Sequence, residues 1–328
     1  MRKPWSVFCF VLLAVSPCYI AGASRAAASQ NADMSAQAPC DKQCLTDLVK
    51  QYLEALLKHD LSTLPLAGSV RFTENRKQMP LGDGLSKTVS AIPFRGEVVA
   101  DPVSSQVVFF GAVKEGSATD LFTVRLRAVG RKIGEIETLV YRPSPTAPMS
   151  IDIHPDLQLL AIMKPFFESA LLPSERRDRA TLLATANSYF EGIEQHTASI
   201  VPFADGCNRV ENGQMTTNNP NNARLLSPTG CAEQFNAQVF THISKVRERR
   251  IMIADVDRGL VAAYVFLDVP GTQRTRELNG RTVAELPQSM KPRSNFLGPE
   301  LFKVQAGQIR LIQAFMLPSE PFGARSGW

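Results

Sequence analysis

The feature that most constrains this chain is an internal repeat. When 137 is added to residue numbers in the first half, identical residues coincide without a gap over more than twenty positions. A constant shift of this kind is typical of a duplicated structural unit, so we expect both halves to share one fold. The coinciding pairs are Tyr52 and Tyr189, Glu54 and Glu191, His59 and His196, Pro65 and Pro202, Glu74 and Glu211, and Asn75 and Asn212.

Each half begins with a helical pattern and continues with strand patterns. In residues 44–60 and 180–196 apolar side chains recur every three or four positions, which predicts a helix with one buried face. The β-branched, apolar runs that follow are separated by glycine-containing turns, as in strands. Helices followed by antiparallel strands predict an α+β fold.

The repeat also predicts the domain organisation. We expect a first repeat over residues 38–145, a proline-rich linker over residues 146–172 and a second repeat over residues 173–328. The strand patterns of the two halves align only with a wider shift, so the second half contains insertions. They are expected in the polar, turn-prone segments 218–231 and 270–294.

Residues 1–28 have the pattern of a secretory signal peptide, with two basic residues before an apolar run that ends at small residues. The run is shorter than the roughly 20 residues of a membrane-spanning helix, and no later stretch is long and apolar enough. Cleavage after Ala23 or Ala28 fits best, with lipid attachment at Cys18 as an alternative. We therefore expect a periplasmic or secreted protein with no membrane association after cleavage.

Four cysteines remain after the signal segment, Cys40, Cys44, Cys207 and Cys231, an even number that predicts disulfides in an exported chain. Three pairings are formally possible, and closeness in sequence favours Cys40 with Cys44 and Cys207 with Cys231. Neither pair has the spacing of a zinc site, and the histidines are scattered, so no metal is predicted. The net charge of +5 is not concentrated in one tract, so nucleic-acid binding is not expected.

Several stretches of the second half resemble a known family. "VPFADGCNRVENG", "RGLVAAYVFLDVPG" and "ELFKVQAGQIRLIQAFMLPSEPFGARSGW" resemble the SnoaL-like branch of the nuclear transport factor 2-like superfamily, and in particular an exported two-repeat family. The resemblance implies two tandem cone domains, in which helices pack on a curved, mainly antiparallel sheet around a pocket. It also implies that the two cones pair as an intramolecular pseudo-dimer, with a homo-oligomer as a further option.

The same resemblance implies a class of chemistry. Enzymes with this cone use a buried acid or histidine, aromatic walls and no cofactor, because an apolar cavity raises a carboxyl pKa toward neutral pH. Other members only bind, so function has to be argued from the site. We expect a small, largely apolar organic molecule in the pocket and, if there is catalysis, a lyase, isomerase or hydrolase. The alternative is a non-catalytic binding or scaffold protein.

The candidate residues divide between those that the halves share and those in which they differ. A shared residue is more often needed by the fold, so Glu74 and Glu211, with Asn75 and Asn212, are candidates both for structural roles and for the pocket. The second half has Arg209 where the first has Phe72, which makes its strand more polar and its pocket the better candidate. Arg209 can bind an oxyanion, a substrate carboxylate or Glu211.

Four further predictions concern the pocket walls. Alternation in residues 135–140 places Glu137 on one face with Glu135, and we consider it the pocket acid of the first repeat. Tyr52 and Tyr189 lie on the buried helix faces, as core residues or ligand contacts. His242 is a candidate base or a structural histidine. A Cys207–Cys231 disulfide would hold residues 213–230 either as a lid over the pocket or as a plain surface loop.

Overall fold

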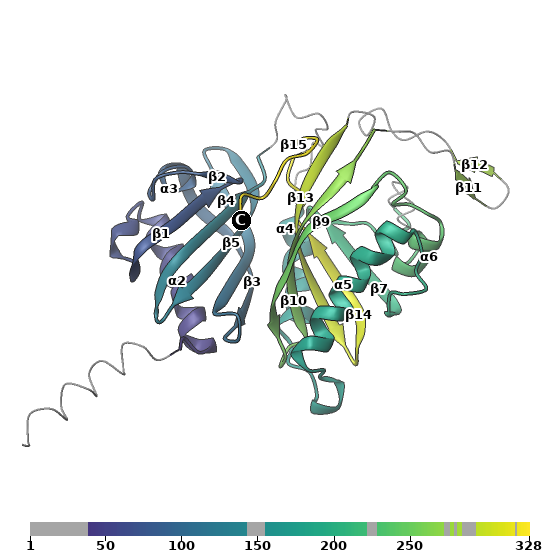
Figure 1. The fold of residues 1–328 in the computed structure, drawn as a ribbon, viewed down its shortest axis with the longest axis horizontal. Helices are drawn as coiled ribbons and strands as arrows, with labels where there is room; N and C mark the ends of the chain where they lie inside the picture. The colour runs from purple at the N-terminus through teal and green to yellow at the C-terminus, as the bar shows by residue number, and fades with distance from the viewer. Residues whose placement is uncertain are drawn as a thin grey trace, which may run out of the picture. The chain divides into compact units, whose positions relative to one another are not determined.

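The computed structural model describes residues 39–142, 155–221, 228–271, 276–278, 281–283, 293–318 and 320–328. The predicted signal peptide therefore lies outside the described residues. Two β-sheets with a long helix against each dominate the described chain (Figure 1). In that part of the chain no helix is long and apolar enough to cross a membrane.

The first sheet has six strands in the order β2-β1-β6-β5-β4-β3. Strands β1 and β6 run parallel, and the other neighbours are antiparallel. The elements of this half are α2 (Lys42–Leu57), η1 (Leu61–Thr63), β1 (Leu66–Glu74), β2 (Lys77–Gln78), α3 (Leu85–Thr88), β3 (Val89–Asp101), β4 (Gln106–Glu115), β5 (Ala118–Val129) and β6 (Lys132–Val140).

The second sheet repeats this order as β8-β7-β14-β13-β10-β9, again with one parallel pair, β7 with β14. A seventh strand, β15, pairs with β13, and β11 and β12 form a separate hairpin. The elements are α4 (Leu157–Glu168), η2 (Pro173–Glu175), α5 (Arg179–Gln195), β7 (Phe203–Glu211), β8 (Gln214–Met215), α6 (Cys231–Asn236), β9 (Lys245–Asp255), β10 (Leu260–Val269), β11 (Arg276–Leu278), β12 (Arg281–Val283), β13 (Ser294–Gln305), β14 (Gln308–Ala314) and β15 (Glu320–Pro321).

The predicted fold class is wrong. The described residues form two β-rich, mixed sheets with few helices, not cones of helices packed on a curved, mainly antiparallel sheet. The sequence pattern identified the helices and strands of each half, but it predicted neither the small share of helix nor the parallel pair that makes each sheet mixed. In each sheet, however, the first long strand pairs in parallel with the last, which local periodicity does not reveal.

The long helices begin and pack as their sequences require. Asp41 and Asp178 cap α2 and α5, because each carboxylate accepts a hydrogen bond from a backbone N–H of the first turn. The apolar side of α2 covers one face of the first sheet and that of α5 one face of the second, which creates two separate cores. These two core faces are called here the helix-covered faces.

A third core lies between the opposite faces of the two sheets. It contains residues from strands of both halves, among them Phe110, Tyr264 and Phe315. Helix α4, within the predicted linker, adds Leu160 and Phe167 to this core. Each sheet is therefore covered on both faces, which explains why the central strands β4 and β10 are apolar along nearly their whole length.

Asn75 and Asn212 support the repeated parallel strand pairing. Both residues have a left-handed backbone, with φ of 45° and 48°. The side chain of Asn75 bonds the carbonyl and the N–H of Val140, each at 2.9 Å, and that of Asn212 bonds the same two groups of Met316 at 3.2 and 2.7 Å. Both asparagines thus act on the backbone, as the structural alternative proposed.

We expect Asn212→Ala to lower the free energy of unfolding by about 2 kcal/mol. Two side-chain hydrogen bonds are lost, and alanine tolerates the left-handed backbone less well than asparagine. Urea unfolding followed by circular dichroism measures the change. Asn212→Gly is the control, because glycine accepts this backbone and removes only the hydrogen bonds. Equal stability of the alanine variant and the parent would contradict the assignment.

Candidate functional site

A buried arginine is at the centre of a polar cluster inside the second half. Arg209, on β7, is 0% exposed although its core neighbours are apolar. Its Nε lies 2.8 Å from Oε1 of Glu211 and 3.2 Å from Oγ1 of Thr216, and its Nη2 donates to Oε1 of Gln234 at 2.6 Å. Its Nη1 has no hydrogen-bond partner among the described residues. The predicted Arg209–Glu211 pair is therefore present, with one guanidinium nitrogen still available.

A second carboxyl group lies beside this pair. Glu300 on β13 is opposite Ala314 on β14, which is in turn opposite Glu211 on β7. The three residues form a row across three strands, and the small alanine leaves the two glutamates with nothing bulky between them. Burial, with a smaller contribution from Glu211, raises the pKa of Glu300 to about 8, while Arg209 opposes the shift. Glu300 is therefore mostly protonated at neutral pH.

Aromatic rings surround the cluster. The guanidinium of Arg209 lies 4.8 Å from the ring centroid of Phe240. The Tyr189 ring, which packs 5.3 Å from Phe235 and 5.3 Å from Phe302, brings its hydroxyl to Arg209. Burial and the neighbouring Glu300 raise the pKa of this hydroxyl, so it stays protonated. Tyr189 thus belongs to the core and to the polar cluster at once.

Burial alone would lower the pKa of Arg209, but Glu211 and Tyr189 outweigh it and the pKa is raised. The guanidinium therefore remains charged in the core. Oε2 of Glu300, like Nη1 of Arg209, has no hydrogen-bond partner among the described residues. The carboxyl of Glu300 and the Nη1 group of Arg209 are therefore two buried donors that can bind an acceptor. Glu211, which is paired with Arg209, is 23% exposed at the edge of the cluster.

The first half lacks this cluster. The residues equivalent by strand register to Arg209, Glu300 and Ala314 are Phe72, Val124 and Thr138. Thr138 occupies the space beside Tyr52 and bonds its hydroxyl at 3.1 Å. The tyrosine of the first half is thereby satisfied, and among the described residues of its helix-covered face there is no counterpart of the Arg209–Glu300 cluster.

Glu74, the counterpart of Glu211, has structural contacts. Its carboxylate lies 2.8 Å from Nη1 of Arg142 and accepts the backbone N–H of Leu85 at 2.7 Å, at the start of α3. The side chain also lies against Gly84, where a Cβ would collide with it. Both carboxylate oxygens of Glu74 therefore have structural partners. Tyr52 and Asn75 also make structural hydrogen bonds.

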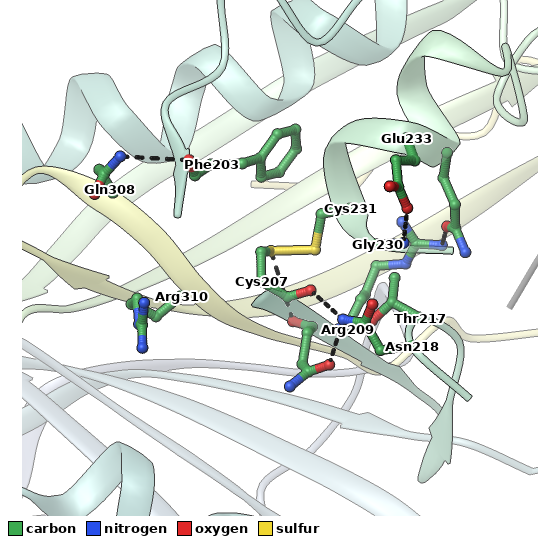
Figure 2. Close-up of a disulfide and its surroundings, with 12 residues drawn as sticks. Phe203, Cys207, Arg209, Thr217, Asn218, Gly230, Cys231, Glu233, Gln308 and Arg310 are labelled. Carbon is green, nitrogen blue, oxygen red and sulfur yellow. Dashed lines mark hydrogen bonds between the residues drawn. A yellow bond between two sulfur atoms is a disulfide. The ribbon is translucent and has the colours of Figure 1, made fainter. Parts of the chain in front are cut away.

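The Cys207–Cys231 disulfide joins the strand that carries Arg209 to helix α6 (Figure 2). Gln234, the partner of Arg209, lies one turn after Cys231 on this helix. Asn218 donates to the carbonyl of Cys207 at 3.0 Å, and Thr217 accepts the backbone N–H of Arg209 at 2.7 Å. The disulfide and these bonds hold α6 and residues 216–218 over Arg209.

Both disulfide pairings favoured by closeness in sequence are confirmed, Cys40 with Cys44 and Cys207 with Cys231. The Cys40–Cys44 bond spans the first turn of α2. Two disulfides are compatible with an oxidising compartment outside the cytoplasm. The middle of the predicted lid, residues 222–227, lies outside the described residues.

Glu137 does not lie on the helix-covered face. The predicted alternation is present, but Glu137 is on the opposite face of β6, with Leu139 and the third core. Its carboxylate binds Nε of Arg125 at 2.8 Å and both terminal nitrogens of Arg250, from β9, at 2.7 and 2.6 Å. The prediction of a pocket acid failed because alternation separates two faces without showing which one the helix covers.

His242 lies in the turn before β9, half-buried. Its Nδ1 donates to the carbonyl of Val239, three residues earlier, at 3.2 Å. This local bond fits a residue that stabilises the turn. Among the described residues, no group of three or more histidine, cysteine, aspartate or glutamate side chains is arranged to hold a metal ion.

Two buried acids that combine a raised pKa with an unpartnered carboxyl oxygen were not predicted from the sequence. Glu300 is the lone acid in the apolar run "FLGPELF", and an isolated charge in a buried strand was the available signal. Glu97 on β3 is the other. Burial, with a contribution from Glu168, raises its pKa to about 8, against the opposing charges of Arg258, Lys164 and Lys303. Neither oxygen of Glu97 has a hydrogen-bond partner in the described chain.

The comparisons with known proteins give little information on function. Residues 175–316 match the sequence model of a family described as a domain of unknown function, DUF8021. No curated protein matches. Five solved chains match, including a crystal structure of a de novo designed protein with curved beta-sheet, which is 17% identical, covers 32% of this chain and 88% of its own, and has a TM-score of 0.26. This score is too low to support a fold argument, and the SnoaL-like resemblance stays a prediction.

Proposed function

We propose that the second half binds a small, largely apolar organic molecule through one polar oxygen, and that Glu300 and Glu211 transfer a proton to and from it without a cofactor. The observation that carries this proposal is the buried Glu300, a neutral carboxyl with an unpartnered oxygen next to an arginine-paired carboxylate. Two neighbouring carboxyl groups in different environments are the arrangement used for paired acid and base roles. The reaction would be of lyase, isomerase or hydrolase type.

Each residue of the cluster has a distinct role in this proposal. Glu300 and Nη1 of Arg209 donate hydrogen bonds to the oxygen of the ligand, and the neutral carboxyl supplies the proton. Glu211, which reaches the edge of the cluster, accepts a proton from the ligand. The rings of Tyr189 and Phe240 contact its apolar body. The two disulfides fit a periplasmic or secreted protein working on such a molecule.

A second candidate is a non-catalytic binding or scaffold protein. Arg209 and Glu300 are 0% and 1% exposed, and a closed interior favours ligand retention or packing over turnover. The same polar cluster would then stabilise a bound molecule, or the residues around it, without transferring a proton. The two functions predict different results for Glu300→Gln, a variant that keeps the shape of the side chain but has no acidic proton to transfer.

The test begins with the compound that copurifies with the native protein, identified by mass spectrometry. Glu300→Gln should retain binding of that compound, because the amide is isosteric, and should lower its turnover by about 100-fold or more. Glu97→Gln is the matched control, since Glu97 has the same raised pKa outside the cluster. Turnover of Glu300→Gln equal to that of Glu97→Gln would exclude the catalytic role. If no compound is bound to either of these two variants, ligand binding would be excluded.

A further inference from the structure

The face of the first sheet that looks away from α2 is charged near one end. Strand register places Thr73, Glu137 and Arg125 in one row across β1, β6 and β5, and Arg71, Glu135 and Arg127 in the next. The equivalents of the first row in the second half are Val210, Gln313 and Leu301. The charged first row is therefore particular to the first half.

Trp328 occupies this charged surface. The guanidinium carbons of Arg71 and Arg125 lie 4.1 and 4.5 Å from the indole ring centroid, within cation–π range. The indole N–H donates to Oγ1 of Thr73 at 3.0 Å, and Arg71 donates to the carbonyl of Gly327. Arg71, Thr73 and Arg125 thus form a slot for an aromatic ring and the peptide group before it, which we call the indole slot.

The segment that carries Trp328 lies on the protein in the manner of a bound peptide. Residues 324–328 have no regular secondary structure, and they alternate between contact and exposure. Ser326 is 1% exposed and Trp328 is half-buried, whereas the side chain of Arg325 is 82% exposed. A segment that lies on a protein surface shows this pattern when some of its side chains face the protein and others face solvent; here the chain turns at Gly327, where φ is 79°, and Trp328 faces the protein.

Polar contacts hold the segment to both halves. Arg76 of the first half donates to the carbonyl of Arg325 at 3.2 Å. In the second half, Glu248 accepts the N–H of Ser326 at 2.8 Å and Arg247 donates to the carbonyl of Ala324 at 2.6 Å. The bond from Arg76 is exposed and the two bonds to the second half are partly buried, so the segment is held by few polar contacts, in contrast to the extensive apolar burial of the sheets. Local opening of such a segment costs less free energy than global unfolding.

We propose that the indole slot is a peptide-recognition surface, that its partner is a peptide with an aromatic residue after glycine, and that residues 322–328 occupy it in cis and leave it for such a partner to bind. Contact with two guanidinium groups selects the aromatic ring, and Thr73 selects a ring that donates a hydrogen bond. Glycine is favoured before the ring because Gly327 has φ of 79° and a Cβ there would lie 3.2 Å from the carbonyl oxygen of Arg76. The proposal is independent of the ligand site in the second half.

The test uses the full chain with Trp328→Ala, which empties the slot and keeps the remaining contacts. The probe is a fluorescent, amidated peptide with the sequence of residues 322–328, followed by fluorescence anisotropy. We expect the variant to bind this peptide at least about 10-fold more tightly than the parent, whose slot is filled. A peptide with alanine in place of tryptophan should not bind. Equal binding by the parent and Trp328→Ala would overturn the proposal.

A second pair of variants identifies the surface. Adding Arg71→Leu to Trp328→Ala should weaken peptide binding about 5-fold, as expected for the loss of one cation–π contact. Adding Arg131→Leu, which removes an exposed arginine outside the slot, should leave binding unchanged. If Arg71→Leu and Arg131→Leu weaken peptide binding equally, the peptide binds through charge alone and not in the indole slot. If Trp328→Ala does not fold, hydrogen exchange of the parent protein decides. If the backbone amides of residues 322–328 exchange only through global unfolding, release of the segment from the indole slot is excluded.

Discussion

Glu137→Leu is expected to lower the free energy of unfolding by about 3–5 kcal/mol, the usual cost of removing one partner from a buried ion-pair cluster. Glu137 is 1% exposed and accepts three hydrogen bonds, one from Arg125 and two from Arg250. Without the carboxylate both guanidinium groups stay buried with much of their charge uncompensated. Urea unfolding at neutral pH, followed by tryptophan fluorescence and by circular dichroism, measures the loss.

The control for this prediction is an exposed pair. Asp83→Asn removes the partner of Lys87 on the surface and should cost well under 1 kcal/mol. The triple variant Glu137→Leu, Arg125→Met, Arg250→Met should recover most of the loss, because it removes all three buried charges and leaves Glu135, the other partner of Arg125, paired with Arg127. If Glu137→Leu proves as mild as Asp83→Asn, water must reach this cluster and the buried position of Glu137 would be wrong.

The second large effect is a dependence of stability on pH caused by Glu300. Its pKa is about 8 in the folded protein and about 4.5 in the unfolded chain, so the folded state retains a proton that the unfolded chain releases between these values. Its contribution to stability is complete below pH 4.5 and is lost as pH rises toward 8. The loss is roughly 1.4 kcal/mol per pH unit, or about 3 kcal/mol by pH 7.

Glu300→Gln should remove this slope, because the amide does not titrate. Unfolding free energies at pH 5, 6, 7 and 8 should therefore fall less steeply in the variant than in the parent. Glu97 has the same raised pKa and contributes a second, separate proton. Glu97→Gln should consequently remove a similar slope, and the double variant should be flatter than either single variant in this range. A slope unchanged in Glu300→Gln would show that Glu300 is ionised in the folded protein.

Local patterns in the sequence predicted local structure well. The steps of three and four residues in α2 and α5 identified their buried faces, and short spacing identified both disulfides. Alternation in β6 correctly separated Glu137 from Ile136 and Thr138. These results depend on helix and strand periodicity and on loop length, which are properties of neighbouring residues.

The candidate site was predicted only in part. Arg209, Glu211 and Tyr189 were singled out because the halves differ or agree at these positions, and the structure brings the three together. Glu300 was missed because β13 reaches the cluster only by pairing with β14, which pairs with β7 a hundred residues earlier in the chain. The mixed sheets were missed for the same reason, since strand order is set by non-local pairing.

The repeated frame, the helix faces, the disulfides and the set of residues that share each strand face follow from local sequence alone. Which of those faces a helix covers, and which strands are neighbours, depends on the folded chain. Glu137 was thereby placed between two arginines on the face away from α2, and Glu300 beside Glu211. The physical reason is that periodicity records the direction of each side chain relative to its own backbone, whereas burial and charge pairing depend on segments far apart in the chain.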